Sequence, residues 1–107
     1  MTQDSQYQVL KVILHAPTPE ALERARNNAI NLRREDSEAE VRIIVNAKAV
    51  ATALDVAHPD MDAFTWVCPN TLTRSNRENR PPLHLLDGAA VLEIARLQQN
   101  GWVYIRS

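Results

Sequence analysis

Short runs of β-branched and aliphatic residues alternate along the chain with segments of helical periodicity, and this alternation constrains the fold more than any other feature. The runs cover residues 8–15, 41–46, 63–68, 83–86 and 102–105. Each is long enough to cross a small sheet and too short to span a bilayer. Because strands that alternate with helices form parallel sheets covered on both faces, the sequence predicts a layered α/β fold.

The segments between these runs carry helix signals. Thr18 supplies an N-cap and Pro19 the first helical position of an amphipathic helix of about 17 residues. Residues 47–56 and 88–99 are also expected to be helical, the second of them capped by Asp87. The predicted fold is therefore a three-layer α/β/α arrangement, Rossmann-like (flavodoxin-like), with a mostly parallel sheet of about five strands.

A polar stretch separates the third and fourth runs. Asn70 or Thr71 can cap a short helix there, and residues 73–82 end in two prolines and are expected to form the most exposed and mobile loop. Three arginines recur in this loop at every third position: Arg74, Arg77 and Arg80. They could gather an anionic ligand or the acidic surface of a partner, but a solvated loop is the simpler interpretation.

Length and charge limit the number of domains and the classes of partner. With 107 residues and no linker-like stretch, we expect a single domain over residues 1–107, with residues 1–6 as a flexible tail. The balance of 12 basic against 13 acidic residues gives a net charge of −1, which argues against nucleic acid or a membrane surface as partner. The first residues lack the basic and apolar parts of a signal peptide, so the expected location is the cytoplasm.

Candidate functional residues follow three of the predicted strands. In open α/β sheets, ligands bind at the carboxyl ends of the strands, where loops and helix N-termini converge. The polar residues expected at this edge are His15, Asn46, Lys48, Cys68, Asn70 and Thr71. Asn46, Lys48, Asn70 and Thr71 are candidates for ligand binding, although a turn residue is the simpler interpretation of Asn46 and a solvated side chain is that of Lys48.

Two kinds of site are not expected. The chain has only Gly88 and Gly101, so it lacks the glycine-rich loop that binds dinucleotides, and we expect no cofactor. One cysteine and scattered histidines do not have the spacing of a metal site.

Cys68 is the most reactive candidate. A thiol at the end of a strand and just before a helix has its thiolate stabilised by the helix dipole and by free N–H groups. The alternative is a small buried residue that happens to end a strand. His15 could pair with Cys68 as an ion-pair partner or proton shuttle if the first and third strands lie close together, or it could simply bond to the backbone.

Several segments together resemble the DsrE/DsrF-like proteins, small α/β domains related to sulfur-relay subunits. The most specific segment covers residues 88–105, with a helix that starts at glycine, a Leu-x-x-x-Gly step and an aromatic last strand. The other similar segments are the strand ending in His15, the Asn27-Asn28 helix with Asn31-Leu32, the strand ending in Val45-Asn46, and Cys68-x-Asn70-Thr71-Leu72. The chain differs from the family at Ala47-Lys48-Ala49, where a glycine-containing turn is common.

The resemblance implies a function and an assembly. It implies a homo-oligomer, a trimer or hexamer, and a cysteine that carries persulfide, for which only Cys68 is available. Cys68 would accept sulfur from a donor protein and pass it to an acceptor thiol, with His15 or the helix N-terminus stabilising the anion. Trp102 and Tyr104, on the predicted last strand, independently suggest an interface between copies.

Two functions are therefore compared. The first is a sulfur carrier or sulfurtransferase-like protein that uses Cys68. The second is a non-catalytic, oligomeric binding module whose cleft near His15, Asn46 and Cys68 holds a small anionic metabolite or a protein partner.

Overall fold

Five parallel strands form the sheet in the computed structural model, which describes residues 8–107. The tail expected over residues 1–6 lies outside this range. The strands are β1 (Lys11–Ala16), β2 (Glu40–Val45), β3 (Thr65–Val67), β4 (His84–Leu85) and β5 (Val103–Arg106). Their order is β4-β3-β2-β1-β5, and all four pairings are parallel. The predicted three-layer, flavodoxin-like α/β fold is confirmed.

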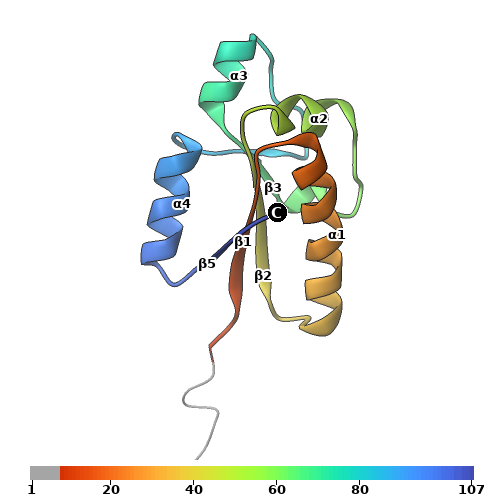
Figure 1. Ribbon diagram of the computed structural model, residues 1–107, viewed down its shortest axis with the longest axis vertical. Coiled ribbons are helices and arrows are strands. Elements are labelled where there is room, and N and C mark those ends of the chain that lie inside the picture. Colours follow the sequence, from red (N-terminus) through yellow and green to blue (C-terminus); the bar gives the residue numbers. More distant parts are fainter. Residues whose placement is uncertain (1–7) are drawn as a thin grey trace, which may run out of the picture.

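Four helices connect the strands and cover the two faces unequally. They are α1 (Pro19–Glu35), α2 (Ala49–Asp55), α3 (Pro69–Ser75) and α4 (Ala90–Gln99). The chain adds strands on one side of β1 as far as β4 and then returns to place β5 on the other side. Connections between parallel strands are right-handed. The helix of the return connection, α4, therefore lies on the opposite face of the sheet from the helices of the earlier connections. Figure 1 shows α1 and α2 on one side of the sheet, α4 on the other, and α3 beyond the carboxyl ends of the strands.

The face covered by α1 and α2 holds the larger core. Thr18 caps α1, because its side chain accepts the Ala21 N–H at 3.0 Å, and Pro19 opens the helix as its sequence predicts. Small residues of α1 let it pack closely against the sheet, and 18 buried residues form this cluster among those the structure describes. Leu22 and Ile43 are completely buried within it.

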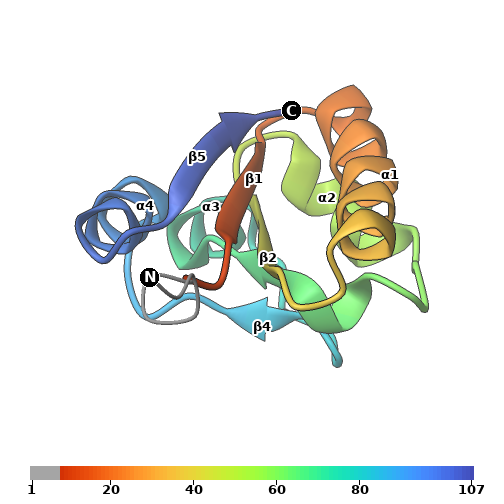
Figure 2. The ribbon, with the colours of Figure 1, turned by 90° about the horizontal axis from the view of Figure 1, so that it is seen from below.

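The opposite face has a smaller core. Seven buried residues form it within the described range: Ile13, Ile44, Cys68, Leu86, Ala90, Ile94 and Trp102. Figure 2 shows α4 beside β5, on the side of the sheet away from α1. The Arg42 guanidinium lies over the rings of both Trp66 and Trp102, at 4.7 and 4.9 Å from their centroids. Trp102 is thus covered within one chain and is part of this core.

Two helix starts differ from the sequence prediction. The N-cap of α3 is Cys68, with Pro69 first in the helix, so neither Asn70 nor Thr71 is the cap. The N-cap of α4 is Ala89 and not Asp87, and no side chain caps this helix. Both shifts leave backbone N–H groups free of side-chain caps where the two helices begin.

The segment 73–82 is largely exposed, as predicted, but it is not a free loop throughout. Residues up to Ser75 belong to α3, and Arg80 is half-buried and donates to the carbonyls of Ala53 and Leu54 at 2.8 and 2.9 Å. Arg80 also pairs with the buried Asp62 at 2.9 Å, and Arg77 pairs with Asp55 at 2.6 Å. The less favoured alternative, in which the three arginines gather an anionic partner, is not supported at Arg77 and Arg80, whose charges already have partners.

Candidate functional site

Three of the predicted site residues lie on one face of the sheet at its carboxyl edge. His15 pairs in register with Ile44 of β2, and Ile44 pairs with Trp66 of β3. Because side chains alternate along a strand, Asn46 and Cys68 point to the same face as His15. This is the face that α4 covers, so the helix lies over the edge where His15, Asn46 and Cys68 end their strands.

Cys68 lies where two helices begin. It is the N-cap of α3, and its thiol also faces the backbone N–H of Ala90, the first residue of α4. Only 5% of its surface is exposed. Both helices therefore direct the positive ends of their dipoles and their uncapped N–H groups at one sulfur atom.

These donors determine the acidity of the thiol. Burial acts to raise the pKa of Cys68, but the N–H of Ala90, the N–H and hydroxyl of Thr71 and the N–H of Asn70 together lower the pKa below its ordinary value. A lowered pKa increases the fraction of thiolate at neutral pH, and the thiolate is the nucleophilic form. The environment of Cys68 is thus suited to a nucleophile, and Asn70 and Thr71 contribute to it.

Thr71 links Cys68 to the turn after β2. Its hydroxyl oxygen accepts the backbone N–H of Ala47 at 3.3 Å. Ala47 has a φ of 50°, in the left-handed region that favours glycine. Ala47 therefore has a backbone conformation that glycine adopts more easily. This conformation directs the N–H of Ala47 at Thr71.

His15 is the centre of a hydrogen-bonded chain of three side chains. Its Nε2 lies 2.9 Å from Oδ1 of Asn46, and its Nδ1 lies 2.6 Å from the hydroxyl of Tyr104 on β5. In the neutral tautomer that satisfies both contacts, Nε2–H donates to Asn46 and Nδ1 accepts from Tyr104. The imidazole is thereby fixed in orientation between β1, β2 and β5.

Sequence reasoning missed Tyr104 as a site residue and treated it as an interface residue. Tyr104 pairs in register with Ile13, which lies two residues before His15 on β1. The side chain of Tyr104 is therefore on the α4 face, as that of His15 is. Its long side chain reaches toward the carboxyl edge to meet His15. Knowledge that β5 pairs with β1 would have identified it, but the strand order cannot be read from the chain.

The His15 chain lines a cavity of about 400 Å³ under α4. The other wall consists of α4 residues, namely Val91, Ile94, Ala95 and Gln98. The strand order reverses at β1, which is where open α/β sheets bind their ligands. Cys68 is not among the residues that line this cavity, although Ala90, whose N–H faces Cys68, immediately precedes Val91 of the lining.

The proposed direct pairing of His15 with Cys68 is not formed. β2 lies between the strands that carry them, and adjacent strands are about 4.8 Å apart. Both ring nitrogens of His15 have partners other than the thiol. The donors that lower the pKa of Cys68 come from backbone and Thr71, not from an imidazolium.

Lys48 lies apart from this cavity. It lines a second hollow of about 330 Å³ between α2 and α3, together with Thr71 and Arg74. Thr71 therefore lies between Cys68 and this cationic hollow. Asn70 is exposed and contributes its backbone N–H. Among residues 8–107, no cluster of three or more histidine, cysteine or acidic side chains could hold a metal ion.

Comparison with known proteins leaves the family open. No protein-family model matches the chain, and no curated protein matches it either. Within the part of the chain that the structure describes, no helix has the length and apolar character needed to cross a bilayer.

Proposed function

We propose that this protein is a sulfur carrier of the DsrE/DsrF-like kind, in which Cys68 takes up and releases sulfane sulfur. The observation that carries the proposal is the convergence of two helix starts on the Cys68 thiol, which lowers its pKa despite burial. A structural cysteine in an apolar site has the opposite shift, because burial alone raises a thiol pKa.

The chemistry is a pair of thiol exchange steps. The Cys68 thiolate attacks the outer sulfur of a donor persulfide R–S–SH, a new S–S bond forms, and the old S–S bond breaks to release the thiolate R–S⁻. The outer sulfur keeps its hydrogen, so Cys68–S–SH results with no net oxidation. An acceptor thiolate then attacks the outer sulfur of Cys68–S–SH and regenerates the Cys68 thiolate.

A cavity on the same face of the sheet as Cys68 supports the entry of a small donor. Its aliphatic wall on α4 and its polar wall of His15, Asn46 and Tyr104 can hold a donor with an apolar part and a hydrogen-bonding end. His15 serves in this proposal to hold Asn46 and Tyr104 in place for the substrate, and not as the base for Cys68. Lys48 and Arg74 are placed to attract an anionic partner on the other side of Thr71.

Assembly and location belong to the same proposal. The edge strand β5 exposes Val103 and Ile105 at 47% and 46%, and an open apolar edge can pair with another copy. We therefore propose a homo-oligomer, a trimer or hexamer, in the cytoplasm, where a lone thiol stays reduced. Its partners are sulfur donors and acceptors and not nucleic acid or a membrane. Sedimentation equilibrium tests the assembly, and a monomer at all concentrations contradicts it.

Persulfide formation tests the sulfur chemistry. The purified protein is incubated with a small persulfide, glutathione persulfide, and its intact mass is recorded. We expect a gain equal to the mass of one sulfur atom, lost on treatment with a thiol reductant and absent in Cys68→Ser. An unmodified wild-type protein, or equal modification of Cys68→Ser, contradicts the proposal.

The cavity also favours a second candidate function. The fixed chain of Tyr104, His15 and Asn46 lines a cavity that can hold a small metabolite without any reaction at Cys68. In that case a ligand found by thermal stabilisation raises the melting temperature of wild type and Cys68→Ser equally, and His15→Ala abolishes the shift. A shift that depends on Cys68 favours the sulfur carrier instead.

A further inference from the structure

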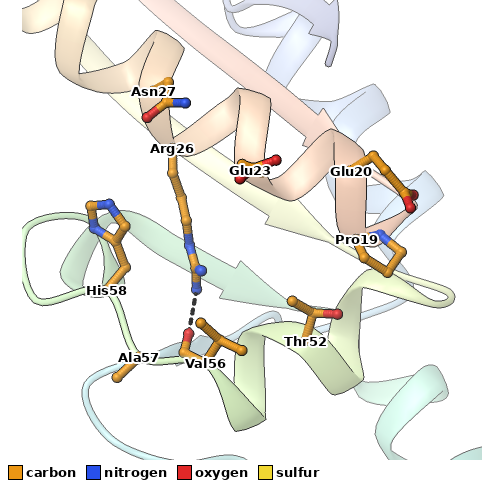
Figure 3. A pocket seen from close by; sticks show the side chains of 9 residues that line it. All are labelled: Pro19, Glu20, Glu23, Arg26, Asn27, Thr52, Val56, Ala57 and His58. Carbon is orange, nitrogen blue, oxygen red and sulfur yellow. Dashed lines mark hydrogen bonds between the residues drawn. The ribbon is translucent and has the colours of Figure 1, made fainter.

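A third cavity, of about 490 Å³, lies on the opposite side of the sheet from Cys68, between α1 and the end of α2. Its lining includes Glu20, Glu23, Arg26, Val56, Ala57 and His58. Figure 3 shows the Arg26 side chain extending from α1 to the Val56 carbonyl in the middle of these residues. In this view, Glu20 and Glu23 lie to one side of Arg26 and His58 lies to the other.

Arg26 is a buried cation with a free donor. Only 6% of its surface is exposed. Its Nη2 donates to the Val56 carbonyl at 2.9 Å, but its buried Nε–H has no hydrogen-bond partner. The buried Nδ1 of His58 also has none. Unpaired buried polar atoms are costly, so two of them in one cavity wall indicate that a polar group completes the site.

The charge around Arg26 is not balanced within the protein. Arg26 and Arg80 share one carboxylate, Asp62, at 3.6 and 2.9 Å. Two guanidinium groups against one carboxylate leave one positive charge in excess. Burial lowers the pKa of Arg26. The Asp62 carboxylate acts to raise this pKa, and the Arg80 charge acts to lower it further. An anion beside Arg26 would relieve this imbalance.

The other end of the cavity is acidic. Glu23 lies three residues before Arg26 on α1, where opposite charges can usually meet. Among the residues that the structure describes, however, neither Glu20 nor Glu23 forms an ion pair with Arg26. The cavity therefore has a cationic end and an anionic end that do not neutralise each other.

We propose that this cavity binds a free aliphatic α-amino acid. The ligand carboxylate faces the Arg26 guanidinium and the His58 ring, and the ligand ammonium faces Glu20 and Glu23. The side chain contacts Val56 and Ala57. A simple anion does not fit this arrangement because the two glutamates repel it, and a simple cation does not fit because of Arg26. The site is separate from Cys68 and gives the protein a second ligand.

Calorimetric titration with L-leucine and L-alanine tests the proposal. The matched probes for leucine are isocaproate, which lacks the ammonium group, and isoamylamine, which lacks the carboxylate. We expect saturable binding of at least one of the two amino acids, and at least about tenfold weaker binding of both analogues, since each loses a charge-assisted contact. Absence of binding by both amino acids, or equal binding by either analogue, overturns the proposal.

Variants on α1 locate the site without disturbing the buried arginine. Glu20 and Glu23 are exposed, so the double variant Glu20→Gln/Glu23→Gln is expected to fold and to weaken amino-acid binding at least about tenfold. The control is Glu35→Gln, which removes an exposed carboxylate from the last turn of the same helix. We expect it to bind as wild type does. Unchanged binding by the double variant, or equal loss in Glu35→Gln, contradicts the assignment.

Discussion

The two faces of the sheet differ in how their cores are built. On the side of α1 and α2, 18 described residues pack into one buried cluster of mostly small aliphatic side chains, and α1 begins at a side-chain cap. On the side of α4, the cluster has 7 described residues, it includes Cys68, and α4 begins with no side-chain cap. The first face is suited to stability. The second leaves helix N–H groups free for a thiol, as the proposed chemistry at Cys68 requires.

The largest expected effect of a substitution concerns the charges beneath α2. Asp62→Asn leaves Arg26 and Arg80 buried without a counter-charge, so we expect a loss of about 4 kcal/mol in the free energy of unfolding. Urea denaturation measures it. Asp60→Asn, in the same segment but exposed, is the control and should change stability by about 0.5 kcal/mol or less. Equal small effects would mean that Asp62 is not needed to hold the two arginines.

Neighbouring isoleucines on β2 compare the two faces directly. Ile43 and Ile44 are both completely buried, but Ile43 points to the α1 face and Ile44 to the α4 face. We expect Ile43→Ala to cost about 4 kcal/mol and Ile44→Ala about 2 to 3 kcal/mol, because the smaller core can relax around the cavity. If Ile44→Ala proves the more destabilising in denaturation experiments, the α4 face is the more rigid one.

The acidity of Cys68 should appear in the pH dependence of stability. Its pKa is lowered in the folded state, so the thiolate stabilises the fold above the unfolded-state pKa of about 8.5, and this contribution is lost as the pH falls through the folded-state pKa. The unfolding free energy of wild type minus that of Cys68→Ser should therefore rise with pH across this window. The gain is about 1.4 kcal/mol for each unit by which the pKa is lowered. A difference that falls as the pH rises would identify a neutral, buried thiol.

The smallest expected effect separates stability from reactivity. Thr18→Ala removes the cap of α1 and should cost about 1 kcal/mol in the free energy of unfolding. The alkylation rate of Cys68 should not change, because α1 lies on the other face. A changed thiol reactivity in Thr18→Ala would show that the two faces are coupled.

The sequence predicts the elements well because their signals are local. Thr18-Pro19 marks the start of α1 correctly, and the apolar runs mark all five strands, although β3 and β4 are shorter than their runs. The start of α4 is predicted wrongly, since Asp87 satisfies the preference for a cap but the helix begins three residues later, at Ala90. Local preference alone does not fix where a helix begins when the preceding loop is held by the sheet.

The site is predicted only in part because it depends on strand order. The rule that ligands bind at carboxyl ends selects His15, Asn46 and Cys68 correctly as residues of one edge. It cannot show that β2 separates His15 from Cys68, nor that β5 brings Tyr104 to His15. The contact between Ala90 and Cys68 is also not predictable from local sequence, because it forms only when the chain returns over the face that α4 covers.

The pH dependence of alkylation at Cys68 is the most direct test of the central claim, that two helix starts activate this thiol. Rates with iodoacetamide are measured for wild type, Thr71→Val, which loses one hydroxyl donor, and Thr73→Val, an exposed control on the same helix. We expect a midpoint for wild type and Thr73→Val clearly below about 8.5 and a higher one for Thr71→Val. A wild-type midpoint at or above about 8.5, unchanged by Thr71→Val, would contradict the claim.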